Sequence, residues 1–214
     1  MTPSFLIFLV GLLYVVIFWG LSLLHRERLS NQFAYEGLSL TGITFAAVRW
    51  GGIAVHPIYF LVLLYLITMR VRLLVELSNM LSKWGRHHQA LAVYRFALHL
   101  FPDRSSRLIA LINMGAAYLE QAKPDRTIEV LANAKAQIVR QLGPKHAAGC
   151  CYNLGMAYRR TGRHGDALRQ FSEVGDIYPM SIYAKLAEKA RKATLEESGM
   201  TVLVRQEEDD PERF

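Results

Sequence analysis

The chain has 214 residues, a net charge of +7 and 52% hydrophobic residues, enough for one ordinary domain plus an apolar segment, or for two small domains. Charge is distributed unevenly: residues 1–75 hold five arginines, no lysine and two glutamates, whereas the remaining 139 residues hold 20 of the 25 basic and 16 of the 18 acidic side chains. This profile predicts an apolar, membrane-type N-terminal third joined to a charged soluble domain. Because the basic residues form no stripe with interleaved aromatics, we expect no nucleic-acid partner.

Residues 4–24 form the first apolar segment. They contain no charged side chain over 21 positions, which is long enough for a helix to cross roughly 30 Å of hydrocarbon. A cleaved signal peptide would need a basic start, a shorter apolar core and a small-residue cleavage site. The first charge is Arg26, so we expect a retained transmembrane helix.

A second span is predicted over about residues 53–75. Pro57 suits an early helical position, where its missing N–H costs little, and Arg70 and Arg72 can extend to the lipid headgroups. Since the sequence has no stop signal before Ser78, we expect this helix to continue directly into the soluble domain. A groove built on that domain would then be held at a fixed height above the bilayer.

Residues 37–52, between the two spans, allow three interpretations: an interfacial helix, a re-entrant segment, or part of a third span that continues to Val55. The stretch is apolar but short, rich in Gly and Thr, and interrupted by Arg49. An arginine in such a place is usually functional, lipid-anchoring or paired with another subunit, and Glu36 is the only nearby acid.

Orientation depends on the number of spans. Basic clusters at residues 25–28 and 69–72 both favour the cytoplasmic side, which three spans satisfy and two do not. With two spans, the orientation is set by the larger basic excess, which follows the last helix. Either way, the soluble domain is expected in the cytoplasm of a protein that is integral to the membrane.

The soluble part contains a repeated helical pattern, clearest in residues 148–181. Its signature positions are Leu154, Gly155, Tyr158, Gly162, Ala167, Phe171 and Pro179. Small Gly155 and Ala167 let two antiparallel helices approach closely, and the aromatic rings fill the space between them. Gly162 ends the first helix and Pro179 the second.

Weaker copies of the pattern occupy residues 71–104 and 108–141. In the middle copy Ala122 stands where the turn glycine is expected, and in the first copy Ser78 replaces the small-helix glycine. These spacings resemble the tetratricopeptide repeat family, over about residues 71–181. The resemblance implies a three-repeat α-α superhelix, which together with the predicted N-terminal transmembrane helices (1–75) makes the expected fold all-α.

Two further segments follow the repeats. Residues 182–198 are helix-favouring, with Ile182, Leu186 and Ala190 on one face, and arrays of this kind need such a terminal capping helix. Residues 199–214 are predicted to form a disordered acidic tail.

The resemblance also implies a binding site, because the first helix of each tetratricopeptide repeat lines a concave groove that holds a peptide or helix. Asn113 and Asn153 occupy equivalent positions, where an amide can both donate to and accept from a peptide backbone; equally, these residues can brace a neighbouring helix. Val75 and Gly149 stand where chaperone-binding repeats carry lysines, so we expect no chaperone-tail binding. The predicted groove, an apolar floor with a basic rim, comprises Asn79, Ile112, Asn113, Ala116, Leu119, Tyr152, Asn153, Met156, Arg159 and Arg160.

Catalytic chemistry is not indicated. Cys150 and Cys151 are adjacent. Neighbouring side chains on a helix point in different directions, which disfavours a disulfide between them, and two thiols are too few ligands for zinc; we expect one packed and one partly exposed thiol. The histidines, including the His87–His88 pair, lack ligand partners at metal-binding spacing. We therefore expect no enzyme, no catalytic, metal or cofactor site, and no small-molecule substrate.

The sequence thus predicts a membrane-anchored adaptor or scaffold that binds a protein or peptide partner, itself membrane-associated, at the lipid surface. Assembly of a membrane complex is one use of such a scaffold. The alternative is an accessory subunit of a larger membrane complex, whose main contacts are made by the transmembrane region. A membrane enzyme or transporter is disfavoured, because two or three helices leave little room for an enclosed site.

Overall fold

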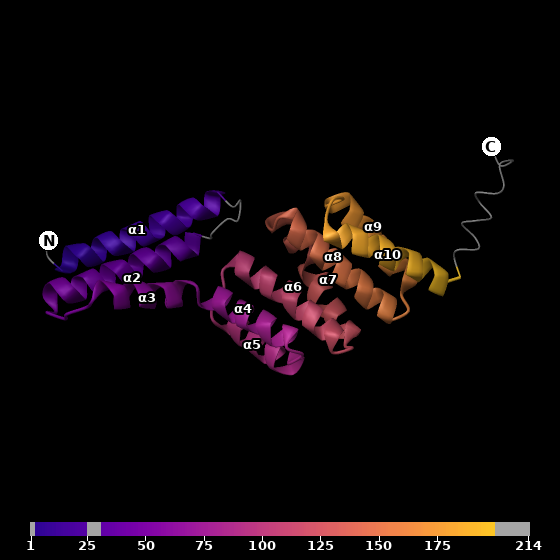
Figure 1. Cartoon of the computed structure of the whole chain (residues 1–214), viewed down its shortest axis with the longest axis horizontal. Coiled ribbons are helices and arrows are strands. Elements are labelled where there is room, and N and C mark those ends of the chain that lie inside the picture. Colours follow the sequence, from indigo (N-terminus) through magenta and orange to yellow (C-terminus); the bar gives the residue numbers. More distant parts are fainter. Residues whose placement is uncertain (1–2, 25–30, 200–214) are drawn as a thin grey trace. The chain divides into compact units, whose positions relative to one another are not determined.

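A computed structural model describes residues 3–24 and 31–199, and within them the chain forms ten α-helices and no strand (Figure 1). The all-α prediction is therefore confirmed for this part of the chain. The helices divide into two compact units. The first unit comprises the described residues up to 80 together with 93–107, and the second comprises residues 81–92 with the described residues from 108 onward.

In the first unit, three helices pack against one another: α1 (Pro3–Leu24), α2 (Asn31–Trp50) and α3 (Pro57–Thr68). Gly11 allows α1 and α2 to approach closely, since a Cβ there would lie 2.2 Å from the Thr41 hydroxyl. The hydroxyls of Tyr14 and Thr68 are 2.7 Å apart and join α1 to α3. The core of this unit contains Ile7, Tyr14, Val15, Phe33, Phe60, Leu64 and Met69.

Helix α2 ends at Trp50 and does not continue to Val55. The amide of Gly51 still donates to Ala47 at 2.9 Å, but Gly52 has a φ of +65° and turns the chain away from the helix. A helical third span running through to Val55 is therefore not formed. Helix α3 starts later, with Pro57 in its first turn and His56 as the N-cap.

The predicted continuous helix over residues 53–75 is wrong, because it breaks at Met69. Helices α3 and α4 (Arg70–Lys83) meet at an angle of 70°. The Thr68 hydroxyl donates to the Leu64 carbonyl at 2.7 Å, a bond that bends helices, and the Arg70 guanidinium donates to the Ile67 carbonyl at 2.8 Å. The predicted straight helix from the last apolar segment into the soluble domain is therefore not formed.

Among the described residues, no single helix combines the length and the apolar character needed to cross a bilayer, whereas the bent α3–α4 pair meets both criteria jointly. Residues Ser4–Gly20 of α1 form a shorter apolar helix. The basic cluster at 25–28 and the acidic tail from residue 200 onward lie outside the described residues. Span number, orientation and tail disorder thus stay predictions.

Two helices lie mostly within each predicted repeat range, and the first of each pair begins before it: α4 and α5 (His87–His99), α6 (Arg104–Glu120) and α7 (Pro124–Gln141), and α8 (Pro144–Arg160) and α9 (His164–Ile177). The turns between the paired helices share one geometry. In each turn a backbone amide donates to the carbonyl five residues earlier at 2.9 Å: Arg86 to Leu81, Lys123 to Tyr118, and Arg163 to Tyr158. In each turn one residue has positive φ: Gly85 (+74°), Ala122 (+55°) and Gly162 (+74°).

Helix α10 (Ile182–Glu197) packs on α8 and α9, but through a different face from the one predicted. Ala187, Ala190 and Thr194 are buried, whereas Ile182 is 70% exposed and Leu186 is 41% exposed. Only Ala190 of the predicted stripe is therefore in the interface. A Tyr183 ring atom would lie 3.2 Å from a Cβ at Gly149, so the glycine makes room for the ring.

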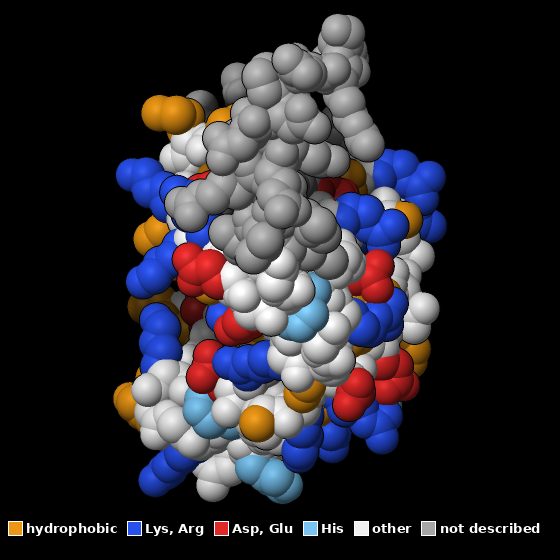
Figure 2. Space-filling model, turned by 90° about the vertical axis from the view of Figure 1, so that its right-hand side faces the viewer, with side chains coloured by type: hydrophobic (Ala, Val, Ile, Leu, Met, Phe, Trp, Pro, Cys, Tyr) orange, Lys and Arg blue, Asp and Glu red, His pale blue; other side chains and the backbone are white. Residues whose placement is uncertain are grey.

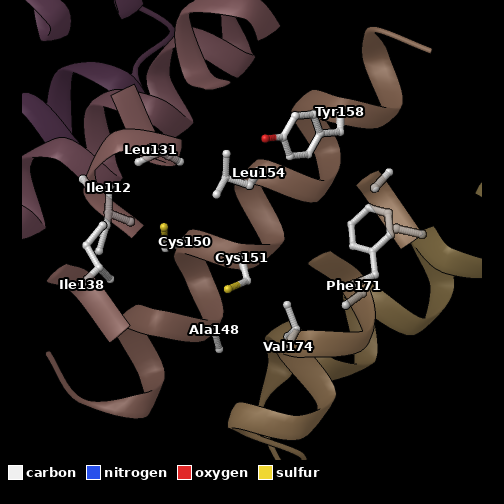
Figure 3. Packing of buried hydrophobic residues seen from close by; sticks show 14 of the residues in the cluster. Ile112, Leu131, Ile138, Ala148, Cys150, Cys151, Leu154, Tyr158, Phe171 and Val174 are labelled. Atoms are coloured by element: carbon white, nitrogen blue, oxygen red, sulfur yellow. The ribbon is translucent and has the colours of Figure 1, made fainter. Parts of the chain in front are cut away.

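The core of the second unit joins α6–α10, and both cysteines lie in it. Figure 3 shows Cys150 and Cys151 on α8 with their sulfurs pointing in different directions, among Ile112, Ile138 and Val174. Both side chains are 0% exposed and both are free thiols. The predicted partly exposed thiol is therefore wrong. Burial raises the pKa of each thiol to about 12 because the thiolate would lose its hydration.

Candidate functional site

The candidate site is the surface formed by the first helices of the two repeats in the second unit, α6 and α8. Two glycines place these helices against their partners: a Cβ at Gly115 would lie 2.7 Å from Leu131 of α7, and one at Gly155 would lie 2.5 Å from Phe171 of α9. The buried Thr127 hydroxyl donates to the Gly115 carbonyl at 2.9 Å. The predicted roles of Gly155 and Phe171 are confirmed.

Asn113 and Asn153 each lie two residues before these glycines, so the packing of each helix pair gives them equivalent positions. Both side chains are half-buried. Within the described chain, neither side-chain amide makes a hydrogen bond. Each can therefore offer one acceptor oxygen and two donor hydrogens to a ligand.

The predicted apolar floor is divided between surface and core. Ala116, Tyr152 and Met156 are half-buried and keep surface for a ligand. Ile112 and Leu119 are each only 6% exposed, so they support the site from beneath. The Tyr152 ring lies 6.2 Å from the Phe171 ring and 6.0 Å from the Tyr183 ring, and burial raises the pKa of its hydroxyl.

The two arginines at the end of α8 have partners that the sequence analysis missed. Arg159 donates through Nε to Glu197 of α10 at 2.9 Å and through a terminal nitrogen to the same carboxylate. This hydrogen bonding raises the pKa of Arg159 and lowers that of Glu197. Arg160, an exposed residue, donates to the Leu119 carbonyl at the end of α6. No spacing in the sequence indicates either contact.

Asn79 belongs to the first unit, so its place relative to the other predicted groove residues is not defined. Its side-chain oxygen accepts a hydrogen bond from the Tyr94 hydroxyl at 2.5 Å, and Tyr94 is 1% exposed. Here the amide braces a neighbouring helix, which is the alternative that the sequence left open for asparagines of this kind.

Surface charge on the C-terminal side of the molecule is mixed. Figure 2 shows Lys and Arg side chains interspersed with Asp and Glu on the face it displays. One such pair, Lys135 of α7 and Glu173 of α9, links the two repeats. In the part of the chain that the structure covers, no group of three or more His, Cys, Asp or Glu could hold a metal ion.

A second polar cluster, which the sequence analysis missed, lies in the first unit at the α3–α4 bend. Both terminal nitrogens of Arg70 donate to the Glu36 carboxylate, at 2.5 and 2.9 Å, and Gln32 donates to the same carboxylate at 2.9 Å. The acid predicted to lie near Arg49 therefore pairs with Arg70. Arg49 is exposed in the last turn of α2.

Comparison with known proteins bears on part of the chain. No curated protein matches the sequence. Residues 106–179 match the tetratricopeptide repeat family, a range that covers most of α6 and all of α7, α8 and α9. The first predicted repeat, 71–104, lies outside it. The match supports a tetratricopeptide repeat assignment for the two helix pairs that carry Asn113 and Asn153.

Proposed function

We propose that this protein is an adaptor that binds a protein or peptide segment along α6 and α8. Tetratricopeptide repeats generally mediate protein–protein interaction and scaffolding and are typically non-catalytic. The observation that carries the proposal is the pair of unbonded, half-buried amides of Asn113 and Asn153 at equivalent positions of the two matched repeats. Amides in this register suit the backbone of an extended ligand, whose polar groups recur along its length.

The side chains around the two amides indicate which class of ligand fits the site. Ala116, Tyr152 and Met156 provide apolar surface beside them, and Arg160 adds an exposed positive charge at the end of α8. An amphipathic segment with an acidic end complements this arrangement. Because Arg159 is already bonded to Glu197, its charge is partly neutralised and contributes less.

The binding experiment uses the full chain in detergent-solubilised membranes. In the Asn113→Ala/Asn153→Ala double variant, the affinity for the partner should fall about fivefold to 150-fold, as expected for the loss of one hydrogen bond per amide, each worth about 0.5–1.5 kcal/mol. The matched control is Asn133→Ala, since Asn133 is exposed on α7 and bonds only its own helix, to the Glu129 carbonyl. Equal capture of the partner by the unmodified chain, the double variant and Asn133→Ala would refute binding at Asn113 and Asn153.

The proposal places the adaptor at a membrane, with α1–α3 as the attachment and the repeats in the cytoplasm. Support comes from the outward faces of α1 and α3, which are apolar rather than polar. Exposed on α1 are Phe5, Phe8, Leu9, Leu13, Val16 and Ile17, and exposed on α3 are Ile58, Tyr59, Val62, Leu63 and Leu66. Contiguous apolar surface of this kind marks contact with lipid or with another protein.

The same surface favours a second candidate, an accessory subunit whose apolar helices contact other subunits of a membrane complex. Replacing residues 1–56 with an unrelated span separates the two proposals. An adaptor that acts through the repeats keeps its partner after the exchange, whereas an accessory subunit loses its complex.

A further inference from the structure

The packing of the first unit does not explain the conformation and the exposure of Phe101. It lies between α5 and α6, is 84% exposed, and has a φ of +50°. Left-handed backbone is unfavourable for any residue with a Cβ, and an aromatic ring in water forgoes the free energy of burial. The chain thus holds an exposed ring in a strained conformation.

Three hydrogen bonds fix this conformation. The Phe101 carbonyl accepts from the Gln32 side chain at 2.9 Å and from a terminal nitrogen of Arg70 at 3.4 Å. The Leu100 carbonyl accepts from Nε of Arg70 at 3.1 Å. Glu36 accepts two further hydrogen bonds from Arg70. The backbone of Phe101 is thus bonded to a cluster of side chains that connects α2 with the α3–α4 bend. Backbone strain of this kind persists only where surrounding contacts impose it. The hydrogen-bonded cluster therefore holds the Phe101 ring in its exposed position.

The position of this cluster relates Phe101 to the apolar surface of the same unit. Arg70 lies two residues beyond Thr68, the last residue of α3, and Tyr65 and Leu66, one turn before Arg70, are 40% and 51% exposed. Phe101 therefore lies where the apolar face of α3 ends and a polar layer of Gln32, Glu36 and Arg70 begins.

The charges around Phe101 are mainly positive. Arg72 and Phe101 line one pocket, together with Asp103, and the exposed Arg104 and Arg107 follow in the first turn of α6. An aromatic ring at the edge of an apolar surface, with arginines beside it, suits the interfacial zone of a bilayer that contains anionic headgroups.

We propose that Phe101 inserts into the headgroup–acyl boundary of an anionic membrane and sets the depth at which the α3–α4 bend sits. This inference rests on the proposed membrane attachment and adds to it a defined contact. Phosphate headgroups pair with Arg72, Arg104 and Arg107 while the ring enters the boundary, and the Arg70–Glu36 cluster keeps the ring in place.

The test measures depth with nitroxide spin labels on the full chain, reconstituted into vesicles of phosphatidylcholine and phosphatidylglycerol. The labelled variants are Phe101→Cys, Phe96→Cys and Leu13→Cys; Phe96 on α5 is a 56% exposed aromatic of the same unit, and Leu13 on α1 is 54% exposed. The native thiols are buried, so they do not compete for the label.

Collisions with oxygen, which concentrates in lipid, are compared with collisions with a water-soluble nickel chelate. The expected ratio of oxygen to nickel collisions is severalfold higher at position 101 than at position 96, and higher at 101 with phosphatidylglycerol than without it. A lipid-like signal at Leu13 with a water-like signal at Phe101 overturns the insertion but leaves the attachment standing, and would then favour a protein contact for the ring. A water-like signal at Leu13 overturns both. As a second measurement, Phe101→Trp fluorescence should be quenched by brominated lipid more strongly than Phe96→Trp fluorescence.

Discussion

Ala122 occupies a turn position that glycine holds in the other two repeats, so replacing it should stabilise the protein. Its φ of +55° compares with +74° at both Gly85 and Gly162, and the flanking backbone hydrogen bonds are the same. Left-handed backbone costs a residue with a Cβ about 1–2 kcal/mol. Glycine removes this cost but adds about 0.4–1 kcal/mol of unfolded-state entropy, so Ala122→Gly should raise the free energy of unfolding by about 1 kcal/mol.

The assay follows urea unfolding through the exposure of Cys150 and Cys151, which are fully buried in the same unit. With a urea dependence of about 2 kcal/mol per molar, Ala122→Gly should move the labelling midpoint upward by about 0.5 M. The reverse exchange, Gly162→Ala, should lower the midpoint by a similar amount. A Cβ at Gly162 meets no atom within 4 Å, so only the backbone term changes.

The control is Ala136→Gly, at an exposed position inside α7. There glycine should lower the free energy of unfolding by about 1 kcal/mol, so the same chemical change has opposite signs at positions 122 and 136. A midpoint that falls in both variants would refute the reasoning from positive φ.

Three further predictions concern the core of the repeats. Gly155→Ala should lower the free energy of unfolding by about 1–3 kcal/mol, because its Cβ would lie 2.5 Å from the buried Phe171 ring. In urea titrations Gly175→Ala should be neutral or stabilising, because a Cβ there meets no atom within 4 Å. Native protein should resist a thiol reagent that labels both Cys150 and Cys151 after denaturation, and fast native labelling would contradict their burial. Since burial raises the pKa of these thiols from about 9 to about 12, the folded state keeps protons that the unfolded state releases. The free energy of unfolding should therefore fall as pH rises from about 9 toward 12.

The sequence predicted the two matched helix pairs well, because their features are local. Gly155 and Gly162 each serve a contact or a backbone angle set by nearby residues, and both roles are confirmed. The sequence also showed that Ala122 replaces the glycine expected in the turn of the middle repeat. The helix pairs of the two matched repeats follow from the same short-range pattern.

What the sequence did not predict depends on contacts between distant segments. The break at Met69 involves Arg70, whose partners Glu36 and Leu100 lie 34 and 30 residues away. Periodicity alone indicated a continuous apolar helix there. The pairing of Arg159 with Glu197 spans 38 residues and likewise has no local signal.

The packing face of α10 and the environment of the cysteines were mispredicted for a related reason. Side chains 100° apart on a helix usually differ in exposure, but α8 is covered by helices on more than one side. Both Cys150 and Cys151 are therefore buried. On α10, small Ala187 and Ala190 allow close contact, and larger Ile182 and Leu186 stay outside.

Site-specific photo-crosslinking in native membranes tests the central proposal, partner binding along α6 and α8, most directly. A photoreactive residue at Asn153 should crosslink to a distinct membrane-associated protein, and unlabelled Asn113→Ala/Asn153→Ala protein should compete poorly for that product. The same photoreactive residue placed at Ser172, which is exposed on α9, should give little of this crosslinked product. Strong crosslinking from Ser172 with none from Asn153 would contradict the account.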